Sequence, residues 1–355
     1  MKLLEGQSLT LPVGSALLLL WLLYRTVLFF RFHHKYNFPN LLPGVPLFGN
    51  MLQIPTDTAE RRLYLHKLAA KYGEMFRLKV GSNYWLFMNS QRVANEILDK
   101  RGARCISRQN LPMPGDVASG GKRIIFMPYG NLWKWECKLI HEIIGPGNRN
   151  VFAPLSFIEE FEDLAERQRQ GKATTCFISE FQRLGKDKRL DYESTVFLAG
   201  SLIEAGSDTT RLALNQLMAG AAPFPKPVHR ARKELDEICG ANAEGPPLVS
   251  EVDSLPYIKA IGKEVLRWNT SLPEIAHSLI EDDSFEGYNL PARTNVIWKT
   301  WGVHMGASEY EQPDRFWPER FLNEDLDKPI KGHLAFEQAA EYAQDGSSPA
   351  TPFNC

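Results

Sequence analysis

The sequence has few cysteines and almost no net charge. Its five cysteines are odd in number, scattered over 355 residues and never in C-x-x-C spacing. This argues against a disulfide framework or a structural zinc site and favours a reducing, cytosol-facing compartment. The formal net charge is -1, from 41 basic and 42 acidic side chains, so no overall field would draw the chain to nucleic acid. We therefore predict no nucleic-acid partner.

Nucleotide-binding motifs are also lacking, because no G-x-G-x-x-G follows a predicted strand and no Walker loop occurs. With 44% hydrophobic residues the chain can bury a substantial core. Apolar spacing predicts a mainly α chain, with helices near 60–72, 91–100, 132–144, 157–169, 192–218, 228–239 and 257–268. A small β part is expected where alternating residues form a hairpin over 76–88.

One long apolar run stands near the N-terminus. Residues 11–24 are almost wholly apolar, and residues 27–30 extend the run past Arg25 to about the 20 residues that a spanning helix needs. A signal peptide or a buried helix is the alternative, but no small-residue cleavage pattern follows and the next residues are basic. We therefore expect residues 1–36 to be a single-pass anchor in membrane lipid, with the body in the cytosol.

The next segment, residues 37–50, contains three prolines and two glycines and cannot form a helix. We interpret it as a stiff hinge that fixes the orientation of the body at the bilayer. An ordinary loop is an equal alternative.

A glycine-bearing motif, Ala205-Gly-Ser-Asp-Thr-Thr210, lies in the middle of a predicted helix. Gly206 costs roughly 1 kcal/mol there relative to alanine, and with Ala205 it would leave a groove without side chains. Asp208 and Thr209 are an acid and an alcohol that could hold water and relay protons. Taken alone, the motif is explained more simply by a buried amphipathic helix whose Thr209 bonds back to a carbonyl.

A second motif pairs Glu264 with Arg267, which share one face of a helix because they stand three residues apart. The same E-x-x-R pattern occurs at four positions, Glu74, Glu166, Glu180 and Glu264. Only Glu264 lies between the glycine-bearing helix and a third motif, Pro318-Glu-Arg-Phe321. The order of the motifs therefore selects it.

In this order the three motifs resemble the cytochrome P450 family of haem-thiolate monooxygenases, and the resemblance runs from about Pro39 to Phe336. It implies haem as cofactor, NADPH-cytochrome P450 reductase as electron-donating partner and a small apolar organic substrate that receives one oxygen atom. The motif style is similar to fungal microsomal members that tailor secondary metabolites. That similarity implies that the protein resides in the membrane of the endoplasmic reticulum.

The resemblance implies roles for residues on both sides of the haem. Ala205 and Gly206 would lie against the macrocycle, while Asp208 and Thr209 would relay protons to the reduced oxygen. These four residues are the expected catalytic and distal cofactor contacts.

Behind the haem, the resemblance implies a structural clamp of Glu264, Arg267 and Arg320, which is tolerable in the interior only when all three charges are paired. The alternative is three solvated surface charges. Trp133 and His277 would bond the haem propionates, although a lone histidine near a strand is more often exposed or satisfied by the backbone.

Two departures from the family precede the clamp. The arginine expected on the helix of Trp133 is replaced by Cys137, a small buried residue rather than an iron ligand, so one propionate contact is lost or passed to Lys134 or Lys138. The stretch from Trp133 to Asp208 is less than half of what the family usually needs. We therefore expect the helices that roof the substrate pocket to be missing, with a junction near 145–150.

The third departure follows Phe336, where the start of the haem-cysteine loop matches but the position of the cysteine is Ala343. Residues 337–355 form a polar tail unlike the family, and Cys355 is not expected to bind iron. We predict a partial P450 domain over 51–336 that is impaired or inactive as an enzyme. The alternatives are a non-catalytic remnant that acts as a membrane-bound interaction protein, and an error in the coding sequence after Phe336.

Overall fold

The computed structural model describes residues 10–39, 42–45, 48–144, 170–171, 191–240, 245, 247–270, 274–328 and 332–333. Its α-helices are α1 (Thr10–Lys35), α2 (Thr58–Tyr72), α3 (Gln91–Ala94), α4 (Asn131–Ile144), α8 (Tyr192–Ala221), α9 (Pro225–Cys239), α10 (Pro256–Trp268) and α11 (Thr300–His304). Short helical turns lie between them, among them η1 (Met51–Gln53), η2 (Asn95–Asp99) and η8 (Pro318–Phe321). The predicted helix over 157–169, the junction at 145–150 and Ala343 lie outside the described residues.

A four-stranded sheet has the order β1-β2-β6-β3. Its strands are β1 (Met75–Val80), β2 (Asn83–Met88), β3 (Ile275–Ser278) and β6 (Asn295–Trp298). Strand β2 pairs in parallel with β6, whereas β1 with β2 and β3 with β6 are antiparallel. The predicted hairpin over 76–88 is therefore confirmed. A second hairpin joins β4 (Asp283–Phe285) to β5 (Tyr288–Leu290) through Gly287, whose φ of 79° suits glycine.

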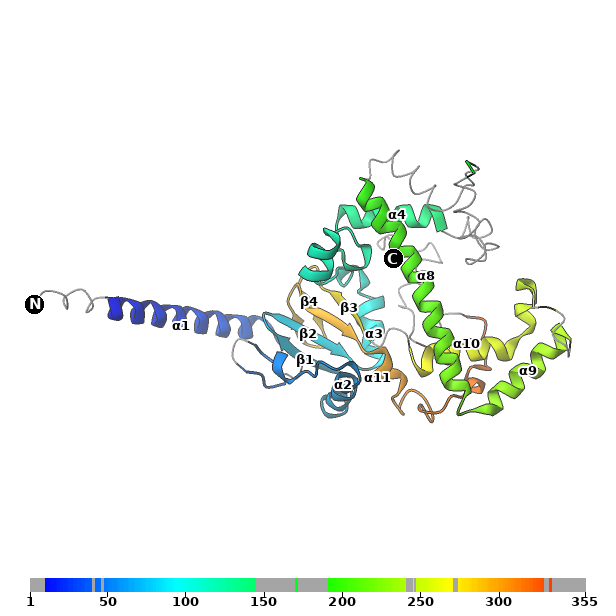
Figure 1. The fold of residues 1–355 in the computed structure, drawn as a ribbon. Coiled ribbons are helices and arrows are strands. Elements are labelled where there is room, and N and C mark those ends of the chain that lie inside the picture. The colour runs from blue at the N-terminus through cyan, green and yellow to red at the C-terminus, as the bar shows by residue number, and fades with distance from the viewer. Residues whose placement is uncertain are drawn as a thin grey trace, which may run out of the picture.

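The sheet lies between the N-terminal helix and the helical part of the body (Figure 1). Helix α2 packs on β1, and one core cluster joins these two elements to β2 and β6; it is made of Leu65, Leu68, Phe76, Leu78, Phe87 and Ile297. Helix α8 runs from α4 to α9 and crosses α10, which also packs against η8 (Figure 1). The fold is thus mainly α with a small β part, as predicted.

Most predicted helices are confirmed with bounds that differ by a few residues. The helix expected over 91–100 differs more, because it begins as α3 and continues as the five-residue π-turn η2. Its predicted N-cap is present, since the backbone N–H of Val93 donates to Ser90 Oγ at 3.3 Å.

Helix α1 is the one helix in the described part of the chain that is long and apolar enough to cross a membrane, over Gly14–Phe32. The side chains of this span are not buried by the rest of the protein. Length and composition are the whole of this support, and a signal sequence would satisfy the same test.

Candidate functional site

Helix α8 carries the glycine-bearing motif on an open face. The helix begins after Asp191, whose carboxylate accepts from the N–H of Ser194 at 2.7 Å. Half-way along, Ala205 and Gly206 are exposed, and a Cβ built on Gly206 would meet no heavy atom within 4 Å. A flat group could therefore approach the backbone at this point.

The acid and the alcohol of this motif do not face each other. Thr209 Oγ1 donates to the carbonyl of Ala205 at 2.6 Å, and Asp208 pairs with Arg211 at 2.9 Å. The hydrogen bond from the Thr209 side chain to a backbone carbonyl, expected for a simple amphipathic helix, is thus present. However, Asp208 and Thr209 are exposed rather than buried. The proton-relay role of Asp208 and Thr209 stays a prediction.

Glu264 and Arg267 form a fully buried, bidentate ion pair on α10. Arg267 Nε lies 2.7 Å from Glu264 Oε2, and Arg267 Nη2 lies 2.8 Å from Oε1. Arg320 of η8, whose side chain is 10% exposed, brings its Nε to 3.2 Å from the same Oε2. The structure therefore joins the three residues of the expected clamp into one cluster, with a single carboxylate between two guanidinium groups.

Further hydrogen bonds tie this cluster to the segment between α11 and η8. Trp317 N–H donates to Glu264 Oε1 at 2.7 Å, and Arg267 Nη1 donates to the carbonyls of His304 at 3.0 Å and Pro313 at 2.8 Å. Burial lowers the pKa of His304 to about 3, and nearby Arg267 adds to this effect, so His304 is neutral beside the cluster. The cluster thus holds a loop against α10.

The other E-x-x-R matches have different partners. Glu74 pairs with Arg92 at 2.6 Å, whereas Arg77 lies over the ring of Phe38 at 4.1 Å. The matches at 166 and 180 lie outside the described residues. Of the two described matches, only Glu264 pairs with its own arginine.

Trp133 and His277 are linked through one short loop. Trp133 is buried on α4 and packs on Tyr129 with 5.6 Å between ring centroids, and the N–H of Tyr129 donates to Ser107 Oγ at 3.2 Å. Ser107 forms a β-bridge with Ser278, the neighbour of His277. The two expected propionate contacts therefore lie on connected elements.

Arg108 is a residue that the sequence analysis missed. Its Nη1 donates to the carbonyl of Ala276 at 2.7 Å and lies 3.0 Å from His277 Nε2. Because an arginine only donates, His277 Nε2 is the acceptor. Arg108 stands in none of the recognised motifs, and its proximity to His277 depends on the Ser107 bridge, so the sequence carries no local signal for it.

Cys137 is disulfide-bonded, and the cysteine spacing, which argued against a disulfide framework, gave no indication of this single bond. It is buried, as predicted. Cys105 is a free but buried cysteine, and burial raises the pKa of its thiol to about 12. Cys239, the other free cysteine of the described residues, is the last residue of α9 and lies in the sequence between the motif at 205–210 and the Glu264–Arg267 pair. Lys134 and Lys138 are exposed, and Lys134 lies over the Tyr129 ring at 4.7 Å.

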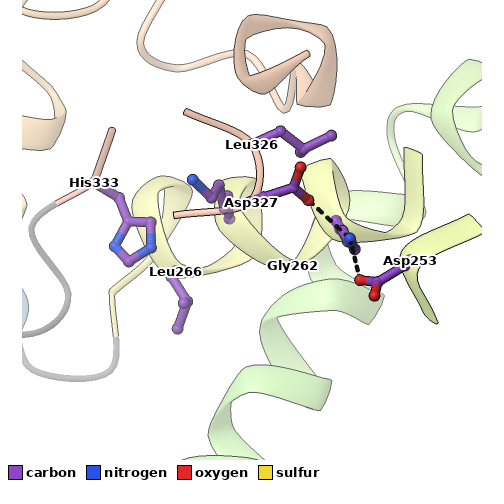
Figure 2. Close-up of a pocket in the computed structure, with 8 residues that line it drawn as sticks. Asp253, Gly262, Leu266, Leu326, Asp327 and His333 are labelled. Atoms are coloured by element: carbon purple, nitrogen blue, oxygen red, sulfur yellow. Dashed lines mark hydrogen bonds and ion pairs between the residues drawn. The ribbon is translucent and has the colours of Figure 1, made fainter. Parts of the chain in front are cut away.

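A cavity of about 670 Å³ opens beside α10, lined by Asp253, Lys259, Gly262, Lys263, Leu266, Leu326, Asp327 and His333 (Figure 2). Lys259 bridges Asp253 and Asp327 at 2.8 Å each (Figure 2). With Lys263, the lining has two lysines for its two aspartates, so it presents no excess charge of either sign to a ligand. On α10 the cavity borders Leu266, which lies between Glu264 and Arg267, but its lining contains none of the expected catalytic, haem-contact or clamp residues.

The described residues fit the edge of a haem group but not its iron. Arg108, His277 and Trp133 bring hydrogen-bonding groups together near one loop, and Gly206 leaves an open helix face. The iron of a haem-thiolate protein needs a cysteine thiolate, whereas Cys137 is disulfide-bonded, Cys105 is buried as a thiol and Cys239 lies at the end of α9, outside the elements that carry the haem motifs.

A cytochrome P450 family model matches residues 39–151 and 152–337. The chain is 26% identical to cytochrome P450 monooxygenase verL of Clonostachys rogersoniana, over 89% of this chain and 76% of that protein. It is 24% identical to cytochrome P450 monooxygenase fogE of Aspergillus ruber, over 81% of this chain and 71% of that protein.

Solved structures support the same fold. A zebra fish cytochrome P450 with progesterone has a TM-score of 0.62 and 19% identity, over 76% of this chain and 85% of that one. The two segments of the family match meet beside the predicted junction at 145–150. With the family model covering most of the sequence, the chain belongs to the cytochrome P450 family.

Proposed function

We propose that the chain is a membrane-anchored relative of fungal secondary-metabolite P450 monooxygenases that, as it stands, does not hold haem through a cysteine thiolate. The similarity to curated fungal monooxygenases supports the first half. The observation that carries the second half is that Ala343 occupies the family's cysteine position, while of the described cysteines Cys137 is disulfide-bonded and burial raises the pKa of Cys105 to about 12. The chain is therefore impaired or inactive as a monooxygenase.

In the family, haem supplies oxygen activation, with electrons from NADPH through a reductase and a small organic molecule as substrate. The cluster of Glu264, Arg267 and Arg320 stabilises the body, because it ties α10 to the segment before η8 rather than presenting a reactive group. Helix α1 would hold the body at the cytosolic face of the endoplasmic reticulum.

A second candidate is a non-catalytic, membrane-bound interaction protein. The observation that favours it is that the buried ion-pair cluster is complete although a thiolate ligand is lacking among the described cysteines. Such a chain would keep the fold without the chemistry.

The haem content of the purified protein tests the proposal. We expect full-length chain from cells supplied with a haem precursor to contain far less than one haem per chain, because Ala343 stands where the family's cysteine thiolate is expected. A fungal P450 relative expressed in the same cells serves as the control and should be fully loaded. One tightly bound haem per chain would contradict the proposal.

A further inference from the structure

A buried lysine without a partner lies where helices α2 and α11 pack side by side (Figure 1). Lys299 stands between β6 and α11, and its side chain is only 2% exposed. Its backbone N–H donates to the carbonyl of Met88 at 3.2 Å, which holds it against β2. Among the residues that the structure describes, nothing forms a hydrogen bond with its Nζ, which is itself buried. An amine in the interior costs free energy unless an acceptor or a counter-charge reaches it.

Two side chains of α2 reach the same contact through Trp301 of α11. His66 lies edge-on to the Trp301 ring with 5.7 Å between centroids, and the guanidinium carbon of Arg62 lies over that ring at 5.3 Å. Arg62 and His66 stand four residues apart, so they share one face of α2. Arg62 Nε and His66 Nδ1 are also buried atoms with no hydrogen-bond partner in the described part of the chain. Both helices therefore bring unpaired nitrogen atoms to one tryptophan.

The Lys299 amine lies close to these groups. A Cβ built on Gly302, the residue after Trp301, would lie 3.3 Å from Lys299 Nζ. Burial lowers the pKa of His66, and the nearby charge of Lys299 lowers it further, so the imidazole is neutral. A neutral imidazole carries one proton, and with that proton on Nδ1 this atom is a donor. The contact can thus offer three donors, from Arg62, His66 and Lys299.

Little negative charge balances Lys299. Burial lowers the pKa of its amine to about 8, and the carboxylate of Glu274 opposes this shift only in part. Glu274 is half-buried, and within the described residues it forms no ion pair with Lys299. At neutral pH the amine is still mostly protonated. The interior therefore holds a positive charge whose counter-charge is not supplied by a contacting side chain.

We infer that Arg62, His66 and Lys299 form a binding site for a small monovalent anion, which we assign as chloride. Such an anion accepts hydrogen bonds from all three nitrogen atoms and supplies the charge that Lys299 lacks. A water molecule is a poorer occupant, because it carries no charge and brings two more donor hydrogens. The three nitrogen atoms are buried, which favours a small ion over phosphate. None of these residues belongs to the three motifs, so the inference does not depend on haem or on the proposed function.

Urea unfolding of the full-length chain in detergent tests the site, with chloride replaced stepwise by gluconate at constant ionic strength. Gluconate is too large to reach buried donor atoms. A ligand that binds only the folded chain stabilises it, so each tenfold rise in chloride above the Kd should raise the folded-to-unfolded ratio about tenfold. Lys299→Met removes the charged amine and keeps an unbranched side chain. We expect it to abolish the dependence on chloride.

Lys263→Met is the matched control, because Lys263 is also a buried lysine but its Nζ donates to the carbonyls of Asp325 and Lys328. Its dependence on chloride should equal that of the wild type, whereas a general salt effect would persist in both variants. Should Lys299→Met not fold, Arg62→Met, at a half-buried position, should weaken the dependence severalfold. A wild type that responds equally to chloride and gluconate overturns the inference. So does an unchanged response to chloride in the variant of Lys299 or, in its place, of Arg62.

Discussion

Replacing Glu264 by alanine is expected to lower the free energy of unfolding by about 3–5 kcal/mol. The carboxylate is fully buried and is the shared partner of Arg267 and Arg320. Its removal leaves two largely buried guanidinium groups without a counter-charge, in surroundings where water cannot screen them. Since a folded domain is stable by only about 5–15 kcal/mol, the variant should lose a large part of its stability.

Urea unfolding of the full-length chain in detergent, followed by tryptophan fluorescence, measures this loss. The control is Glu74→Ala, which belongs to another E-x-x-R match but is half-exposed and pairs with Arg92, so it should cost less than about 1 kcal/mol. Replacing Glu264, Arg267 and Arg320 together by methionine removes every charge of the cluster and should be less harmful than Glu264→Ala alone. An alanine variant as stable as wild type would contradict the clamp.

Replacing Glu136 by leucine is expected to stabilise the protein, and the gain should grow as the pH rises. Glu136 lies on α4 with its side chain fully buried, and neither of its carboxylate oxygens has a hydrogen-bond partner in the described structure. Burial, and to a smaller extent the charge of Asp191, raises the pKa of Glu136 to about 8. The folded protein therefore keeps a proton that the unfolded chain releases.

The sign of the effect follows from the two pKa values. The ordinary pKa of a glutamate is 4.5, and the pKa of Glu136 in the folded protein is about 8. At pH values between these two, the carboxyl group of Glu136 is ionised in the unfolded chain but protonated in the folded protein. The free energy of unfolding falls over this window and is lowered by roughly 4–5 kcal/mol above it. Leucine cannot ionise, so it removes this pH-dependent loss of stability, and its side chain fills a similar volume.

Unfolding curves of Glu136→Leu and wild type, compared between about pH 5 and pH 8, measure the pH-dependent contribution of Glu136 to the free energy of unfolding. The stability gap should widen with pH. Glu193→Leu is the control, because Glu193 is an exposed carboxylate that pairs with Lys122 at 2.6 Å, and its gap should stay small. Parallel pH profiles for wild type and Glu136→Leu would reject the buried-proton account.

The sequence alone was sufficient to predict those elements whose structure follows from a local residue pattern. Helix α10 begins and ends within one residue of its predicted range, because its apolar face repeats at helical spacing. The order of the motifs, rather than the pattern E-x-x-R itself, was enough to select Glu264 over Glu74. The π-turn at 95–99 was not predicted, since a run of helical residues does not reveal a single wider turn.

Other features depend on contacts between distant residues. Arg108 and His277 are 169 positions apart, and no local pattern connects them. Glu136 resembles an ordinary helical glutamate in the sequence, and only the packing of α4 shows that it is buried. The disulfide at Cys137 is likewise a property of the folded chain, because cysteine spacing gave no sign of it.

The most direct test of the central claim, a P450 fold without a thiolate-bound haem, is the reduced carbon-monoxide difference spectrum of membranes that contain the full-length chain. The account predicts no Soret band of the long-wavelength, thiolate-ligated type, because we expect the family's cysteine at the position of Ala343, and because Cys137 is disulfide-bonded and Cys105 stays a buried thiol. A fungal P450 relative in the same membranes should give that band. The same band from this chain, in proportion to its amount, would contradict the account.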